Sequence, residues 1–452
     1  MDAIASYFKF RERGTDLATE ARAGLTTFVV MAYILFVNGS ILTGGFAATK
    51  HADPHFTLAT IAAATAFVAG VMTIAMGVIG NYPFALAAGL GINGIVAYSL
   101  TAKGLSAQGA MGVIVLEGVL ITVLVVVGLR EAIMNAVPLA LKRAIGVGIG
   151  LFILFIGFAN GGLIKSNVPA TLVTISFPTT TAQWVFLAGL LITIVLWVMR
   201  IKAALVISIL LTTVLALVVG VAKVPPAADL IATPKFDTLG QFDVGQVFGQ
   251  LPIVAALLTI FAIMLSDFFD TMGTVTGVAA EAGLTEEDGS VPGVGRVLLV
   301  DSLAAVAGGA AGISSNTTYI ESAAGVADGG RTGFASVVTG VLFLLAILLS
   351  PIALIVPAAA TAPALVLVGY LMFTLVKDIP VGDVEEGLPA LLTMILMPLT
   401  FEITVGIGAG FISWVLIKVV RGKMGQIHWL MWVVSIGFAI FFAQDWINAF
   451  IK

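Results

Sequence analysis

The sequence lacks cysteine altogether and contains few histidines and few charged residues. Without cysteine, the chain can form no disulfide, thiolate metal site or cysteine nucleophile. His51, His55 and His428 lie in or beside predicted loops, so a histidine-based metal centre is not expected. Charged residues make up 10% of the 452 positions, whereas a soluble domain carries about a quarter. These shortages exclude an ordinary soluble globular protein.

Motifs of common catalytic sites are missing as well. The sequence contains no P-loop, no Ser-His-Asp set and no zinc motif, so it indicates neither ATP hydrolysis nor covalent catalysis. The formal net charge of -4 is too small to suggest a nucleic-acid partner. We therefore expect a protein that is not an enzyme and that uses no cofactor or metal ion.

Apolar residues are abundant instead. They account for 60% of the chain, and the mean hydropathy is +1.12. Runs of about 20 apolar residues, long enough to cross a bilayer as a helix, recur from end to end. They predict an all-α polytopic membrane protein with about 14 transmembrane segments in two sets of seven. The first set covers roughly 23–43, 57–79, 82–100, 108–129, 142–161, 181–199 and 203–221, and the second roughly 252–279, 294–311, 312–326, 332–355, 362–376, 387–401 and 403–420.

The distribution of basic residues predicts the orientation of these segments. With the N-terminus inside, fifteen Lys and Arg residues fall in inside loops and five in outside loops. Inside loops of membrane proteins carry the excess of Lys and Arg. The N-terminus, residues 1–22, is therefore expected to be cytoplasmic. The five outside residues are Lys50, Lys103, Lys165, Lys223 and Lys235.

Seven segments per set is an odd number, so the second set is inverted relative to the first. Inverted repeats are a common transporter architecture, with the site where the repeats meet. The third and tenth segments, which occupy matching places, are both interrupted by glycine and small polar residues. We expect each to be a short strand followed by a half-helix, because irregular backbone at membrane depth persists only beside a cavity. An apolar stretch at about 428–450 is left over and either spans outward or lies along the interface.

Acidic residues inside these apolar runs are the leading site candidates. Asp267 and Asp270 lie near the end of the eighth segment, and Glu321 follows the Gly/Ser/Asn/Thr run of the tenth. Acids at membrane depth are costly and usually mark a substrate, ion or proton site. We predict that Asp270 and Glu321 face one pocket. The alternative for Glu321 is a capping box with Thr318, in which the glutamate caps its own helix.

Four further polar residues lie inside predicted segments. Glu117 and Asp301 are each interpreted as a proton carrier or as a tie between helices. Asn38 and Asn93 are candidate substrate contacts, although buried asparagines often only satisfy broken backbone.

Two long motifs and several shorter ones are distinctive. The long motifs are Asp267-Phe-Phe-Asp-Thr-Met-Gly-Thr274 and the run from Thr318-Tyr-Ile-Glu321 to Gly333, and the shorter ones are Arg22-Ala-Gly-Leu-Thr-Thr-Phe28, Met31-Ala-Tyr-Ile-Leu-Phe-Val-Asn38 and Arg130-Glu-Ala-Ile133. These motifs, which extend over nearly the whole chain, resemble those of a known family, the nucleobase–cation symporters of type 2, in the branch of azaguanine-type adenine, guanine and hypoxanthine permeases. The two long motifs are the most specific.

This resemblance implies a mobile core domain and a gate domain that usually forms a homodimer. The core would comprise residues 23–129 and 251–355, and the gate residues 130–250 and 356–452. It further implies proton-coupled uptake of purine nucleobases by an elevator-like movement, in the cell (inner or plasma) membrane.

By motif position, the resemblance also assigns residues to the pocket. Asp270 and Glu321 match the two carboxylates that hold the base, and Thr274, Ile320 and the Asn93 region match other pocket positions. The sequence departs from the family at Ala88, where Pro is common, at Ile95 and Val96, where aromatic residues are common, and at Phe401-Glu402-Ile403, which replaces a more usual Tyr-Ser-Ile. Because a missing ring changes base stacking, these departures concern the identity of the substrate.

Together these features give a hypothesis for the mechanism. Asp270 or Glu321 would carry the coupled proton while both orient the base, with Asp267, Glu117 and Asp301 as further candidates for proton coupling. A carboxyl group in a dry pocket, close to a second acid, holds a proton more readily than one in water. A uracil, xanthine or small-anion carrier on the same fold is the alternative, and a channel is less favoured.

Overall fold

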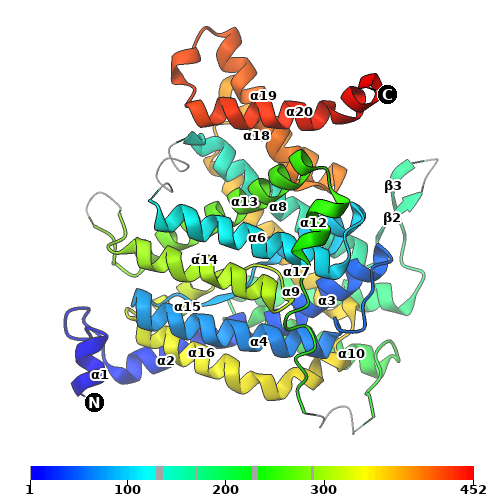
Figure 1. Ribbon diagram of the computed structural model, residues 1–452. Helices are drawn as coiled ribbons and strands as arrows, with labels where there is room; N and C mark the ends of the chain where they lie inside the picture. The colour runs from blue at the N-terminus through cyan, green and yellow to red at the C-terminus, as the bar shows by residue number, and fades with distance from the viewer. Residues whose placement is uncertain (1, 129–135, 168–170, 227–232, 287–289, 452) are drawn as a thin grey trace.

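The computed structural model describes residues 2–451 except for 129–135, 168–170, 227–232 and 287–289. The motif at Arg130 and the predicted domain boundary between residues 129 and 130 lie outside the described residues. Long helices make up most of the molecule and run across the view in Figure 1, with the N-terminal helix α1 (Asp2–Tyr7) at the left. The side on which α1 lies is called the N-terminal end below.

Nine helices of the described part of the chain are long and apolar enough to cross a membrane. They correspond to nine of the predicted segments, the first of which bends at Ala32 and Tyr33 between two helices. These nine contain α2 (Leu17–Met31) with α3 (Ile34–Ala48), α4 (Leu58–Ala75) with η1 (Met76–Gly80), α6 (Ala107–Val126), α8 (Leu139–Asn160), α9 (Thr181–Val198), α13 (Ile253–Glu281), α16 (Gly333–Ala346) with η3 (Ile347–Ile355), α17 (Ala358–Phe373) with η4 (Thr374–Asp378), and α19 (Ile403–Val420).

The other five predicted segments contain shorter elements. Three are single helices: α10 (Ala204–Val218), α14 (Val294–Ala310) and α18 (Val384–Thr400). The third segment is β1 (Leu86–Ala88), α5 (Leu90–Gly94) and η2 (Ile95–Leu100), and the tenth is β4 (Asn316–Thr318) and α15 (Ser322–Ala327). Both interrupted segments therefore have the predicted strand followed by a short helix.

The helices pack in two groups. In the first group, α16 packs against α2 and α4, α3 packs against α4 and α5, α6 packs against α13 and α14, and α15 packs against α2. In the second group, α8 packs against α17 and α18, α9 packs against α10 and α17, and α18 packs against α19. Each group draws on both halves of the sequence, which is the consequence of an inverted repeat.

Glycines allow helices to approach closely in both groups. A Cβ atom on Gly340 of α16 would lie 2.6 Å from the carbonyl oxygen of Gly70 in α4. In the second group, a Cβ on Gly369 of α17 would lie 2.5 Å from the carbonyl oxygen of Gly150 in α8. Helices in membranes associate largely by such close packing of small residues, since burial from water does not drive their contact.

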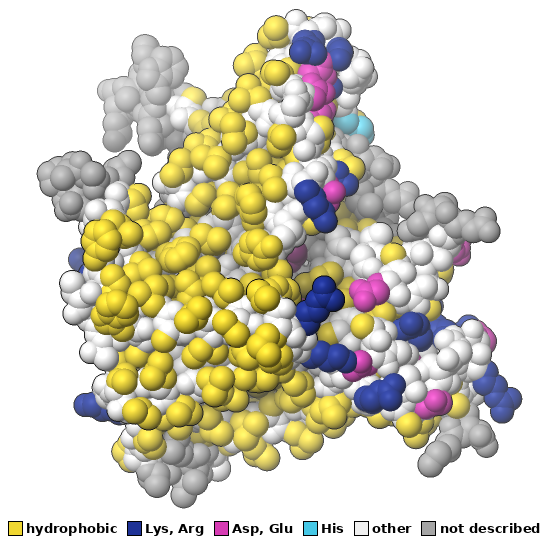
Figure 2. Space-filling model, turned by 180° about the vertical axis from the view of Figure 1, so that it is seen from behind, with side chains coloured by type: hydrophobic (Ala, Val, Ile, Leu, Met, Phe, Trp, Pro, Cys, Tyr) yellow, Lys and Arg dark blue, Asp and Glu magenta, His cyan; other side chains and the backbone are white. Residues whose placement is uncertain are grey.

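Charge is distributed unevenly over the surface. Figure 2 shows a broad hydrophobic face and most of the visible Lys and Arg side chains on the right, which is the N-terminal end after the turn from Figure 1.

The remaining elements lie at the ends or edges of the molecule. They are β2 (Ile164–Asn167) and β3 (Thr171–Ile175), which form a hairpin, α12 (Val244–Gln250), which packs on α6, η5 (Met424–Gln426), and α20 (Trp429–Ile451), the left-over apolar stretch, which is a helix packed against α19 and α13.

Candidate functional site

The two interrupted segments meet in the middle of the first group. β1 and β4 pair antiparallel, with Leu86 opposite Thr318 and Ala88 opposite Asn316. The backbone N–H of Gly89 extends this pairing by donating to the Ser315 carbonyl at 2.8 Å. Tyr319 adds a side-chain bond across the strands, from its Oη to the Ala88 carbonyl at 2.5 Å. The short strands satisfy each other's backbone groups, so both half-helices can begin inside the molecule.

Asp270 lies on α13 beside this crossing, where the two groups of helices face each other. Its side chain is exposed and borders a narrow gap of about 10 Å³. Gly89, Gly91 and Ile92 line the gap from the first group, and Ile149 of α8 and Met372 of α17 line it from the second. This volume holds about one water molecule, so the gap is nearly closed in this conformation.

An exposed strip continues from Asp270 along α13. Gly273, Gly277 and Ala280 are exposed on the same side of the helix, towards its C-terminal end. A Cβ atom added to Gly273 or Gly277 would have no heavy atom within 4 Å. Residues Asp270, Gly273, Gly277 and Ala280 are called the α13 strip below. It joins the gap to the N-terminal end of the molecule.

Glu321 lies at the start of α15 and is half-buried. One of its carboxylate oxygens accepts a 2.6 Å hydrogen bond from the Tyr33 hydroxyl, which comes from the bend between α2 and α3. The capping-box alternative is wrong, because the Glu321 side chain makes no capping bond and Thr318 instead bonds Asp301. Asp270 and Glu321 are close enough to interact electrostatically. The fold thus brings together the two acids predicted to share a pocket.

Asp301 lies on α14 and is bonded to β4. Its carboxylate accepts from the Thr318 backbone N–H at 2.8 Å, from the Thr318 hydroxyl at 2.7 Å and from the Thr271 hydroxyl at 2.7 Å. Three donors suit an ionised carboxylate, which needs several hydrogen bonds when buried. Of the two interpretations of Asp301, this geometry favours a tie between helices.

Asp267 and Glu117 lie deeper than Asp270. Asp267 is 1% exposed and accepts a 2.6 Å bond from the Ser315 hydroxyl, just before β4. Glu117 of α6 is 0% exposed and lies against Asp267. Neither of these acids borders the narrow gap, so they form a buried layer behind Asp270.

The remaining predicted site residues are in different environments. Asn38 is buried and donates to the Thr65 hydroxyl at 2.8 Å and to the Ile313 carbonyl at 3.2 Å, so it supports backbone next to β4. Asn93 of α5 is fully buried, and its amide has no hydrogen-bond partner in the described part of the structure. Thr274 is buried on α13, whereas Ile320, just before Glu321, is 54% exposed.

Sequence reasoning missed several residues that contact the acids. Tyr33, Ser315 and Thr271 each donate to a carboxylate of the site. Thr271 also bonds the Thr317 hydroxyl at 2.7 Å, which extends the network into β4. Tyr33 could have been suspected, since it is the single tyrosine in the first predicted segment, but hydropathy alone does not say which distant acid it meets.

Polar contacts also join the two groups away from the gap. Tyr98 of η2 donates to Asn160 of α8 at 3.1 Å, and Lys103 pairs with Glu402 at 3.3 Å. At the N-terminal end, Lys202 pairs with Asp328, which follows α15. Bonding to Lys202 and then to Thr26 lowers the pKa of the Asp328 carboxyl below its usual value.

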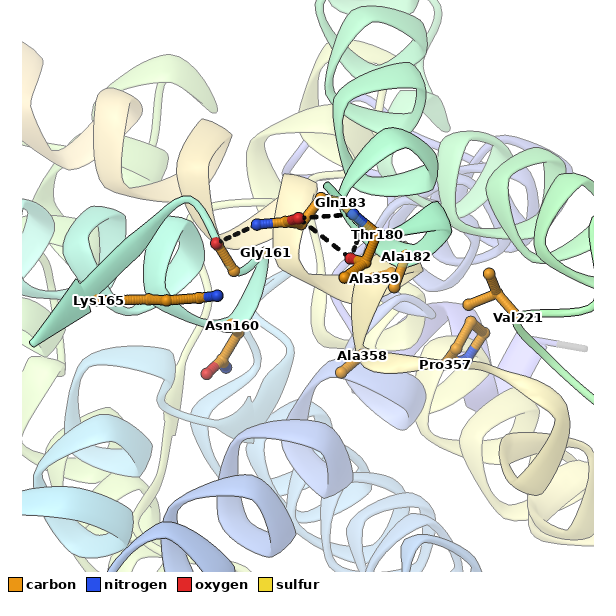
Figure 3. Close-up of a pocket in the computed structure, with 11 residues that line it drawn as sticks. Asn160, Gly161, Lys165, Thr180, Ala182, Gln183, Val221, Pro357, Ala358 and Ala359 are labelled. Atoms are coloured by element: carbon orange, nitrogen blue, oxygen red, sulfur yellow. Dashed lines mark hydrogen bonds between the residues drawn. The ribbon is translucent and has the colours of Figure 1, made fainter. Parts of the chain in front are cut away.

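A larger cavity of about 310 Å³ lies within the second group, away from the acids. Figure 3 shows Lys165, Asn160 and Thr180 around it, with the Gln183 side chain bonded to the Gly162 carbonyl and to Thr180. None of the predicted site residues lines this cavity. Among the described residues, no group of three or more His, Cys, Asp or Glu side chains is placed to hold a metal ion.

Comparison with known sequences gives one family. The sequence model of the Permease family matches residues 19–409. The guanine/hypoxanthine permease PbuG of Bacillus subtilis is 39% identical over 442 residues, which cover 97% of this chain and 99% of PbuG. The adenine permease AdeQ of Escherichia coli is 37% identical over 449 residues, which cover 97% of this chain and 95% of AdeQ.

Comparison with solved structures confirms the fold. The transmembrane domain of a cyanobacterial bicarbonate transporter, BicA, superposes with a TM-score of 0.63 at 14% identity, covering 87% of this chain and 97% of that one. The anion transporter Slc26a9 from mouse gives a TM-score of 0.61 at 12% identity, covering 90% of this chain and 69% of that one. The predicted seven-plus-seven architecture is therefore confirmed, and at these identities the likeness concerns the fold alone.

Proposed function

The chain belongs to the Permease family, and from that premise we propose that it imports purine nucleobases by proton symport with an elevator-like movement of one helix group against the other. The family consists of transporters, which agrees with the absence of catalytic motifs from the sequence. Two relatives named for guanine, hypoxanthine or adenine, each aligned over nearly the whole chain, support the purine class.

The observation that carries this proposal is that Asp270, which borders the gap between the two helix groups, lies close enough to Glu321 for the two acids to interact electrostatically. A purine is flat and has adjacent N–H donors and ring acceptors along its edge. A carboxylate accepts two hydrogen bonds from neighbouring N–H groups, and a protonated carboxyl group also donates one. Two acids, one of them fixed by the Tyr33 hydroxyl, therefore match the edge of such a base.

The position of the gap supports the proposed movement. One wall comes from α5 and α13 of the first group and the other from α8 and α17 of the second. Since the gap holds about one water molecule, a purine fits only when the two groups separate. A displacement of one group past the other, with the acids carried on the first group, would open the site on alternate sides of the membrane.

Orientation and location complete the proposal. The excess of Lys and Arg at the N-terminal end supports a cytoplasmic N-terminus in the cell membrane. In that orientation the α13 strip faces the cytoplasm and offers a route for release of the base. Domain boundaries at 129/130, 250/251 and 355/356, and a homodimer formed through the second group, remain predictions.

Uptake into proteoliposomes tests this function. With an imposed pH gradient, acid outside, the protein should accumulate labelled hypoxanthine, adenine or guanine saturably. Asp270→Asn and Glu321→Gln should each reduce uptake at least tenfold, since the loss of a hydrogen bond to a charged group costs about 1.5–3 kcal/mol. Asp237→Asn, at an exposed loop position, is the control and should keep wild-type uptake.

Competition separates the proposal from its alternative. Excess unlabelled adenine or guanine should block the uptake of labelled hypoxanthine, whereas uracil, xanthine and sulfate should not. Full uptake by either acid variant would remove that residue from the mechanism. Uptake of uracil, xanthine or an anion in place of the purines would show a different carrier on the same fold, and conduction without saturation would show a channel.

A further inference from the structure

Glu117 is buried and has no hydrogen-bond donor among the described residues. It is 0% exposed in the middle of α6, and neither of its carboxylate oxygens has a partner in the part of the chain that the structure describes. The helices α13 and α14 pack against α6, and the titratable groups that face Glu117 from them are Asp267 and Asp301. No Lys, Arg or His of the described residues forms an ion pair with these three acids.

Such a position is unsuitable for an ionised carboxylate. A buried charge with neither a counter-ion nor a hydrogen bond is so unfavourable that the group takes up a proton instead. Asp301 differs, because three donors surround its carboxylate. Glu117 therefore needs a proton, whereas Asp301 does not.

Asp267 offers the matching acceptor. Its Oδ2 accepts from Ser315, but its Oδ1 is buried and has no donor among the described residues. The Glu117 and Asp267 side chains lie within hydrogen-bonding reach of each other. A single proton on Glu117 would neutralise that group and at the same time supply the missing donor to Asp267.

We propose that Glu117 and Asp267 share one proton, and that this buried pair, and not the substrate-facing Asp270 or Glu321, holds the proton that is coupled to transport. The inference rests on the proposed function, which it deepens by assigning the coupling site. It separates the two tasks: Asp270 and Glu321 recognise the base, while Glu117 and Asp267 bind the proton behind them.

The fold provides both a route for the proton and a link to the substrate. Asp270 is exposed, and Asp267 precedes it on α13 by about one helical turn, a rise of about 4.5 Å. A proton can therefore pass from water at Asp270 to Asp267 and then to Glu117. When the pair loses its proton, two negative charges face each other, and their repulsion would displace Asp267 together with Ser315, which is hydrogen-bonded to it. Since Ser315 leads through β4 to Glu321, the change reaches the substrate site along six residues of backbone.

Glu117→Gln tests the assignment in proteoliposomes. The Gln amide can donate to Asp267 as the Glu117 hydroxyl would, but it cannot release a proton. Accumulation of labelled hypoxanthine driven by a pH gradient should fall at least tenfold, to the level without a gradient. Exchange of labelled for unlabelled hypoxanthine at equal pH should persist and lose its pH dependence.

Three outcomes would contradict parts of this scheme, and they are distinguishable. Gradient-driven accumulation by Glu117→Gln equal to wild type would overturn the proton site and leave the purine function standing. Wild-type accumulation driven by a sodium gradient at equal pH, and not by a pH gradient, would overturn it in favour of a sodium ion. Failure of the wild type to transport or exchange any purine would refute the proposed function itself.

Infrared spectroscopy of the purified protein tests the proton directly and does not depend on transport. The C=O stretching band of a protonated, buried carboxyl group should be present in the wild type and absent from Glu117→Gln. Glu20→Gln is a matched control, because Glu20 is equally buried but accepts from the backbone N–H groups of Arg331, Thr332 and Ala335. This control should keep the band. If Glu117→Gln retains every such band, Glu117 is not protonated and the inference is wrong.

Discussion

Glu20 and Glu117 illustrate how the donor set decides what a buried acid can do. Both are 0% exposed. Glu20 accepts from three backbone N–H groups around the first turn of α16, so its charge is balanced by the helix N-terminus. Glu117 has no donor among the described residues and faces another acid. The same residue type therefore serves a structural role at one position and suits proton binding at the other.

Tyr33 is the residue for which a single-atom change is most informative. Its hydroxyl donates to Glu321 at 2.6 Å, and a hydrogen bond to a charged group contributes about 1.5–3 kcal/mol. Tyr33→Phe should therefore weaken the binding of labelled hypoxanthine about tenfold or more, measured by equilibrium binding to detergent-solubilised protein. Tyr7→Phe removes a comparable hydroxyl bond, to the Val78 carbonyl at the exposed N-terminal end, and should leave binding unchanged. Unchanged binding in Tyr33→Phe would show that Glu321 does not depend on this donor.

Among the elements, α13 carries the most predicted site residues. It carries Asp267 and Asp270, and beyond them the α13 strip exposes two glycines that face open space. Glycine lowers helix stability by about 1 kcal/mol relative to alanine. Its repeated use on an exposed helix face within an apolar segment is consistent with a passage that side chains would obstruct.

The absence of cysteine makes this passage testable. In Gly277→Cys the introduced thiol is unique, and it should react with a membrane-impermeant thiol reagent added from the cytoplasmic side. Hypoxanthine should slow the reaction, because Gly277 lies about 10 Å along the helix from Asp270. Ala279→Cys, on the buried side of the same helix, is the control and should not react. Equal labelling of both positions would mean that the α13 strip is not a defined passage.

At the scale of the whole molecule, the two helix groups meet around the narrow gap through packing of α5 and α13 on α8, of α13 on α19 and of α3 on α17, and through a few polar contacts. Two polar pairs lie towards one end: Tyr98 with Asn160, and Lys103 with Glu402. A third pair, Lys202 with Asp328, lies at the N-terminal end. Contacts of this kind are individually weak near a surface, about 0–1 kcal/mol each. Because these contacts lie between the groups, a movement of one group against the other can exchange them without disrupting the packing inside either group.

Asp328 should give this contact a pH dependence. The pKa of Asp328 is lowered in the folded protein, first by Lys202 and then by Thr26, so its stabilising effect is present above the unfolded value of about 3.9 and is lost as pH falls through the folded value. Asp328→Asn should lower the unfolding midpoint slightly at pH 7. The difference from wild type should shrink as the pH falls below the unfolded value, as followed by thermal unfolding in detergent.

The control for this experiment is Glu12→Gln, which breaks an exposed pair with Lys9 within the N-terminal segment and joins no helix groups. It should leave the midpoint unchanged at both pH values. A constant difference between Asp328→Asn and wild type over the whole range would show that the carboxylate charge does not contribute to this contact.

Much of the architecture was predictable because it depends on local properties of the chain. Apolar run length predicted the segments, and the glycine-rich interruptions predicted the strand and half-helix of the third and tenth segments, since both act over short stretches. The bend at Tyr33 was not predicted, because its flanking residues are as apolar as those of an unbroken helix. The shared position of Asp270 and Glu321 followed from the inverted repeat, whereas the capping box at Glu321 was a local pattern that tertiary contacts overrode.

The sequence by itself determined that this protein lies in a membrane, that its two halves are inverted, and that acids occur near the interruptions, because hydropathy and helix-breaking residues act along the chain. The tertiary structure alone decided which side chains meet. Tyr33 and Glu321 are 288 positions apart. Among the described residues, Glu117 is left without a donor because α6 packs with Asp267, and not a basic residue, opposite it. Partner choice in a buried site depends on where helices cross, and no local property of the sequence encodes that crossing.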